Sequence, residues 1–347
     1  MANTIVGLEI TEEGVRAAEV TAGRDRRVVA FGSVPLPPGA AKDSEVFDAD
    51  ALVLALRQLW SRAGIKNRKV TLGIGSRRIL VRDYTTQAMR ADLLAQALPF
   101  QVQDLLPVPA EQAVLDFCPV AQEQDQVSGL LVAAVAETVD ELVTAVARAK
   151  LTVDVVDLAP FGLVRAVTGA AAADETVAAL FLGDHTTYVV VVQNGVPRFV
   201  RIIPMEIMTA AVRERLAASE PADETPPVEP VLETVPASEP LRRRASVRGL
   251  ARTVVMSESD IHEVVTRLGN TLRFYADRSA DAPVTRVLLS GAGAAVPGIA
   301  EALAASLPMP VQLIGASSIA SSKLEFPPGD VDLNLVSTIG LAMGVTR

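Results

Sequence analysis

Cysteine and histidine are almost absent from this sequence of 347 residues. It has one cysteine, Cys118, and two histidines, His185 and His262. A disulfide framework therefore cannot form, and a zinc site built from several histidines and cysteines cannot be assembled. Such sparing use of cysteine is typical of proteins in a reducing cytosol.

Basic residues are outnumbered by acidic ones. The chain has 32 Lys and Arg against 41 Asp and Glu, which gives a formal net charge of −9. Neutralising a phosphate backbone requires a surplus of positive charge on one face of a protein. We therefore expect no binding to nucleic acid.

Long apolar runs are also absent. No segment reaches the roughly 18 apolar residues of a membrane span, and the N-terminal Met-Ala-Asn-Thr does not begin a secretory signal. Hydrophobic residues nevertheless make up 50% of the chain, enough to fill the core of one large or two medium domains. We expect a soluble protein of the cytoplasm.

Short alternating runs occur twice in groups of three. Period-two alternation of apolar and polar residues predicts antiparallel strands. The six runs are 4–10, 14–21 and 27–34, then 177–182, 186–193 and 196–203. Asn194-Gly195 joins the last two and is a strong hairpin signal. Helical and strand patterns alternate after each group, so we predict two α/β lobes related by a pseudo-repeat.

Several later elements are predicted from local signals. Residues 89–106 have a helical pattern that ends at two prolines, and Thr138 with Glu141 forms a candidate capping box. Residues 153–158 are expected to form a buried strand. A last helix is expected after Asn334.

Residues 220–253 differ in composition from the rest. The first part is acidic and rich in proline, so we expect it to be disordered. The second part contains Leu241-Arg-Arg-Arg-Ala-Ser-Val-Arg. This run is either a solvated linker or a patch for anionic lipid or serine phosphorylation.

Four segments carry a resemblance to a known family. They are 6–20, 96–117, 155–166 and 288–299, and the second, with its Leu105-Leu-Pro-Val-Pro109 turn, is the most specific. The chain resembles the type IV pilus assembly proteins of the PilM family, which are actin-like and related to FtsA. The resemblance implies an α/β, actin-like ATPase fold: two RNase-H-like lobes, with a subdomain inserted in the first.

The resemblance also implies domain limits. The first lobe would comprise 1–84 and 151–173, with the inserted subdomain at 85–150. The second lobe would comprise 174–219 and 254–347, and residues 220–253 would stand in place of a small fourth subdomain.

A nucleotide cleft between the lobes follows from the same resemblance. ATP with Mg²⁺ would contact three turns, through Thr11, Gly183, Thr186, Thr187, Gly291, Ala292 and Gly293. Glu9 would be the residue to hold hydrated Mg²⁺. The alternative is that these glycines only form tight turns.

This chain departs from the family at the loops that would serve hydrolysis. Glu9-Ile10-Thr11-Glu12 stands where the family typically has Asp-Ile-Gly-Ser, and Phe181 stands where it has a carboxylate. Thr11 adds bulk, Glu12 adds negative charge, and no group is left to orient an attacking water. We therefore expect no ATP hydrolysis and assign no catalytic residue.

The resemblance implies a scaffold of the pilus assembly machine. Family members bind the cytoplasmic N-terminal tail of the inner-membrane protein PilN, and motor components are further possible partners. The groove would lie between the first lobe and the inserted subdomain, lined by Arg78, Ile79, Arg82, Leu105, Val108 and Pro109. The protein would then reach the inner face of the membrane only through its partners.

Two alternative functions use the same fold. An active ATPase or sugar kinase would need carboxylates where Thr11 and Phe181 stand. An FtsA-like filament former would need an amphipathic membrane helix after the last core helix, whereas this sequence stops at Gly344-Val-Thr-Arg347.

Overall fold

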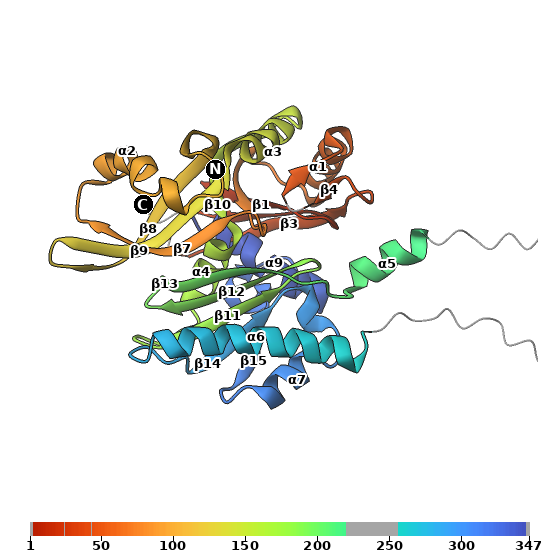
Figure 1. The fold of residues 1–347 in the computed structure, drawn as a ribbon. Helices are drawn as coiled ribbons and strands as arrows, with labels where there is room; N and C mark the ends of the chain where they lie inside the picture. Colours follow the sequence, from red (N-terminus) through yellow and green to blue (C-terminus); the bar gives the residue numbers. More distant parts are fainter. Residues whose placement is uncertain (1–2, 24, 43, 220–255, 345–347) are drawn as a thin grey trace, which may run out of the picture.

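Three sheets carry the fold. The structure is a computed structural model that describes residues 3–23, 25–42, 44–219 and 256–344. It contains a six-stranded, a five-stranded and a three-stranded sheet, and a short ribbon of β4 (Ala41–Lys42) and β5 (Glu45–Val46). In Figure 1 the first half of the chain, red to yellow, lies above the second half, green to blue. The linker predicted at 220–253 lies outside the described residues.

The six-stranded sheet forms the first lobe, in the order β10-β6-β1-β2-β3-β16. Its strands are β1 (Thr4–Ile10), β2 (Gly14–Thr21), β3 (Arg27–Pro35), β6 (Lys69–Ile74), β10 (Thr152–Leu158) and β16 (Ser321–Ser322). β1, β2 and β3 pair antiparallel, which confirms the predicted meander, while β6 and β10 add in parallel.

The five-stranded sheet forms the second lobe, in the order β13-β12-β11-β14-β15. Its strands are β11 (Thr176–Leu182), β12 (Thr186–Gln193), β13 (Val196–Pro204), β14 (Arg286–Ser290) and β15 (Val311–Leu313). Its first three strands again form an antiparallel meander. Asn194 and Gly195 both have positive φ, as the predicted hairpin turn requires. The pseudo-repeat is therefore confirmed.

The three-stranded sheet has the order β7-β9-β8. Its strands are β7 (Leu80–Gln87), β8 (Ala113–Glu123) and β9 (Gln126–Val135), covered by α2 (Ala91–Gln101) and the short helices η1 (Gln103–Leu105) and η2 (Ala110–Gln112). Leu98, Val102 and Leu131 form a small core here. The helix expected over 89–106 is shorter in the structure, where α2 ends at Gln101. The domain limits at 84 and 150 stay a prediction.

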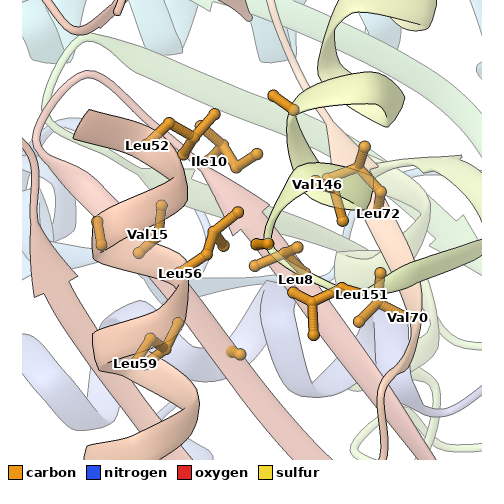
Figure 2. Close-up of a cluster of buried hydrophobic side chains, with 14 of the residues drawn as sticks. Leu8, Ile10, Val15, Leu52, Leu56, Leu59, Val70, Leu72, Val146 and Leu151 are labelled. Carbon is orange, nitrogen blue, oxygen red and sulfur yellow. The ribbon is translucent and has the colours of Figure 1, made fainter. Parts of the chain in front are cut away.

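Helices α1 (Ala49–Ala63) and α3 (Ala136–Arg148) cover one face of the first sheet. Figure 2 shows Leu52 of α1 beside Ile10 and Leu56 of α1 facing Leu8, with Leu72 and Val146 on the other side of the cluster. The second lobe has a separate core under α6 (Glu258–Arg278) and α7 (Ile299–Ser306). Burying such side chains contributes roughly 1.5–3 kcal/mol each.

Two helices lie between the sheets, and each packs on the sheet of the other lobe. α4 (Ala159–Thr168) follows β10 of the first sheet but packs on β12 of the second. α9 (Asp330–Ala342) comes from the end of the chain but packs on β1 and β2 of the first. A Cβ on Gly340 would lie 1.9 Å from the carbonyl oxygen of Gly162, so only glycine permits this helix contact. The pair joins the two lobes.

Three predictions were wrong at the ends or exposure of elements. α3 begins directly after β9, with Val135 as its N-cap, so Thr138 already lies within the first turn and forms no capping box. β10 is an edge strand, so of its residues only Leu158 is buried. The last helix begins at Asp330, before Asn334. Within the described ranges, no helix is both long and apolar enough to span a membrane.

Candidate functional site

Two hairpin turns face each other between the lobes. Thr11 and Gly14 close the β1–β2 turn, with the Thr11 amide donating to the Gly14 carbonyl at 2.9 Å and its hydroxyl at 3.0 Å. Gly183 and Thr186 close the β11–β12 turn, with 3.1 Å between the Gly183 amide and the Thr186 carbonyl. A cavity of about 50 Å³ lies between these turns and is lined by Thr11, Gly183 and Thr186.

A charged contact joins the tips of the two turns. The His185 Nε2 atom lies 2.7 Å from Glu13 Oε1 and 3.7 Å from Glu12 Oε2, and its Nδ1 atom contacts Glu206. Burial alone would lower the pKa of His185, but its bonds to Glu13 and Glu206 and the charge of Glu12 raise it to about 9. His185 is therefore an imidazolium at neutral pH.

Arg215 extends this contact to a second element. It lies on α5 (Ala210–Ser219), and its Nε atom is 2.8 Å from Glu13 Oε2. It also donates to the main-chain carbonyls of Glu12 and Leu36. Glu13, only 8% exposed, thus binds two cations of the second lobe. We call Glu12, Glu13, His185, Glu206 and Arg215 the interlobe ion network.

The Glu9 carboxylate is bound within the protein. Glu9 is 2% exposed and accepts hydrogen bonds from Ser337, at 3.0 and 2.9 Å, and from Thr338, both on α9. The Arg16 Nη2 atom lies 3.7 Å away. Across the residues that the structure describes, no group of three or more His, Cys, Asp and Glu could hold a metal ion. A role for Glu9 in holding Mg²⁺ does not fit these contacts.

Aromatic side chains occupy the base of the same cavity. The Phe181 ring stacks on Tyr188, with centroids 5.5 Å apart, and the Arg16 guanidinium lies 5.7 Å from the Phe181 centroid. Arg16 is 7% exposed, and its Nε is a buried polar atom without a hydrogen-bond partner among the described residues. Phe181 therefore fills the position that the family resemblance gives to a carboxylate.

The glycines of the turns lie in close contact with other parts of the protein. A Cβ on Gly291 would lie 2.3 Å from the Leu182 carbonyl oxygen, and one on Gly293 would lie 2.8 Å from the Leu182 Cβ. A Cβ on Gly183 would lie 2.6 Å from the Thr186 carbonyl oxygen. These close approaches require glycine whether or not a ligand binds, which favours the tight-turn interpretation.

A second cavity, of about 300 Å³, lies beside the β1–β2 turn. Ala292 lines it and donates its amide to the Asn334 side chain at 3.0 Å. The cavity is rich in carboxylates, and Arg16 is the basic residue in its lining; the acidic residues are Glu13, Asp184, Glu214 and Asp330. Thr187, the remaining residue expected at the nucleotide, is fully buried.

The residues predicted for a partner groove are divided between two places. Ile79 and Arg78 line a cavity of about 20 Å³ against α3, and Arg78 is paired with Glu45. Leu105 instead packs on the small core of the three-stranded sheet. Arg82 and Pro109 are exposed, and Val108 is half-buried.

A larger groove opens next to that small cavity and was not predicted from the sequence. It has a volume of about 700 Å³ and shares Val135 with the small cavity. Its apolar lining includes Val46, Ala49 and Ala145, and its acidic lining comprises Glu111, Glu137, Asp140 and Glu141. The acidic spacing in residues 137–141 was visible in the sequence, but its position beside α1 depended on the tertiary fold.

The geometry and the comparisons together define the class of protein. Two lobes with facing hairpin turns, joined by exchanged helices, form an actin-like fold with a subdomain inserted in the first lobe. A family model described as "Type IV pilus assembly protein PilM" matches residues 7–202, which is more than half of the chain. The chain belongs to this PilM family.

One solved structure shares the fold over nearly the whole chain, and more distant ones are also similar. A PilM–PilN type IV pilus biogenesis complex is 20% identical, with a TM-score of 0.77, over 99% of this chain and 98% of that chain. The ethanolamine utilization protein EutJ from Carboxydothermus hydrogenoformans is 14% identical, with a TM-score of 0.48, over 99% and 90%. An archaeal actin homologue is 11% identical, with a TM-score of 0.42, over 98% of both chains.

Proposed function

We propose that this protein is a cytoplasmic scaffold of the type IV pilus machine and binds the N-terminal cytoplasmic tail of a PilN-like inner-membrane protein. Family membership and the likeness to the PilM–PilN complex support the proposal. The observation that carries it is the acidic groove along α3, which η2, β5 and the first residue of α1 complete. Arg148 also lines this groove and is paired with Asp50. We call this groove, with the adjoining small cavity, the tail groove.

The chemistry of the tail groove suits such a peptide. Its floor is apolar, and Ile79 and Val139 continue that floor into the small cavity. Its rim carries Glu137 and Asp140, both exposed. Cytoplasmic segments next to a membrane span are enriched in Lys and Arg, so an apolar and basic tail is complementary to this surface.

The turn predicted at residues 105–109 leads to the tail groove. Pro109 directly precedes η2, and Glu111 of η2 lines the tail groove. β7 is an edge strand, so an extended peptide entering beside Ile79 has free main-chain groups to pair with. The expected interface is small, with its affinity concentrated in a few apolar anchors.

Calorimetry with a synthetic tail peptide tests the proposal. Reversing two rim charges, Glu137→Lys with Asp140→Lys, should weaken binding by about tenfold or more, because a basic tail then meets like charge. The matched control is Asp277→Lys with Glu301→Lys, which makes the same change in net charge at exposed positions on α6 and α7. Equal affinities for both double variants would refute the tail groove.

We also propose that the protein does not hydrolyse ATP. Phe181 stacks on Tyr188 where a carboxylate would have to position a water, and Glu9 is hydrogen-bonded to α9. Phosphate release should stay at the buffer rate in the presence of MgATP. A magnesium-dependent turnover that Glu9→Gln abolishes would refute this part and favour the active ATPase.

A further inference from the structure

The fold family implies a nucleotide in the interlobe cleft, so we tested whether the residues present would accept one. A phosphate group held between the two turns would bond to both of them. Here the side chains of the two turns bond to each other, with 2.7 Å between Glu13 Oε1 and His185 Nε2. The anion that joins the two turns is thus the Glu13 carboxylate, and the cavity beside this contact has a volume of only about 50 Å³.

The charges lead to the same result. The cations of the cleft already lie near carboxylates: Arg16 Nη2 is 3.7 Å from Glu9, although its Nε has no partner among the described residues, and His185 and Arg215 bind Glu13. The neighbouring cavity is lined by four carboxylates and one arginine. A nucleotide triphosphate would therefore enter a field of its own sign, and it would compete with carboxylates for every one of these cations.

The glycines of the turn expected to receive the nucleoside are needed by the fold itself. On the side where a Cβ would stand, Gly291 and Gly293 lie directly against Leu182. Phosphate-binding turns use glycine to let a ligand approach the backbone, whereas these glycines let the backbone approach itself.

We infer that this protein does not bind nucleotide and that the interlobe ion network holds its lobes together instead. The network runs from the β1–β2 turn of the first lobe to His185 and to Arg215 on α5 of the second. It bridges the two facing turns through alternating carboxylates and cations. The inference does not rest on tail binding, since no residue of the interlobe ion network lines the tail groove.

Two measurements on the unmodified protein test the first part. Denaturation of the purified protein followed by ion-exchange chromatography should release no nucleotide, and titration with MgATP should give no saturable heat up to millimolar concentration. A stoichiometric copurifying nucleotide, or a micromolar Kd for MgATP, would overturn the inference.

Hydrogen exchange tests the network itself. Amides of residues 11–14 and 183–186 should exchange slowly in the parent and at least tenfold faster in His185→Ala with Arg215→Ala. Arg273→Ala, which removes an exposed arginine of α6, is the control and should leave both turns unchanged. Fast exchange of both turns in the parent, or no change in the double variant, would contradict the network. Either result would leave the proposal of tail binding untouched. The parent measurement stands even if the double variant does not fold.

Discussion

The ionisation of His185 makes the free energy of unfolding depend on pH. The pKa of His185 is raised from 6.5 to about 9 in the folded protein. At 1.36 kcal/mol for each pKa unit, this difference corresponds to at most about 3 kcal/mol of stabilisation. Because the folded pKa is the higher one, the stabilisation is complete below pH 6.5 and is lost as the pH rises to about 9.

Urea unfolding of the parent and of His185→Gln isolates this effect. Glutamine keeps polar contacts to Glu13 but carries no charge, so the variant should be less stable at pH 6 by about 2–3 kcal/mol. The gap should close by about pH 9.5 as the parent loses its proton. His262→Gln, at the other histidine, exposed on α6, is the control and should shift stability by less than about 0.5 kcal/mol at every pH. A gap that does not change with pH would refute the reasoning.

Two further predictions concern packing. Gly340→Ala should lower the free energy of unfolding in urea by about 1–3 kcal/mol, because the new methyl group meets the Gly162 carbonyl. The control is Gly269→Ala, where the nearest atom is 4.0 Å from the new Cβ, and it should be neutral or stabilising. Equal effects of the two substitutions would contradict the helix contact. Leu105→Asp should lower the melting temperature, because it places a charge against the core of the three-stranded sheet; Phe100→Asp, at a side chain 83% exposed, should not, and a reversed order would refute the placement of Leu105.

Local patterns predicted much of the fold. The bounds of β1, β2 and β12 match the predicted runs to the residue, because turn residues such as Asn194-Gly195 bound them, although all three strands are buried on both faces. The Asn194-Gly195 turn was equally evident, because its left-handed backbone conformations suit those two residues. The family resemblance then supplied the pairing of lobes that no local pattern contains.

The candidate site was only partly predictable. Thr11 and Gly183 were correctly expected at facing turns, but the Glu13 contacts with His185 and Arg215 join residues about two hundred positions apart. Such contacts depend on how the lobes close, which neither propensity nor periodicity encodes. The acidic groove was missed for the same reason, since Glu137 and Asp140 alone have the pattern of an ordinary solvated helix face.

Binding of the PilN-like tail without nucleotide is the central claim, and one calorimetric titration tests it most directly. A synthetic peptide of that tail is titrated into protein shown by chromatography to be free of nucleotide, once in buffer and once with millimolar MgATP. We predict one site with micromolar or tighter Kd and the same affinity in both titrations. No binding in either titration, or binding only with MgATP, would contradict the account.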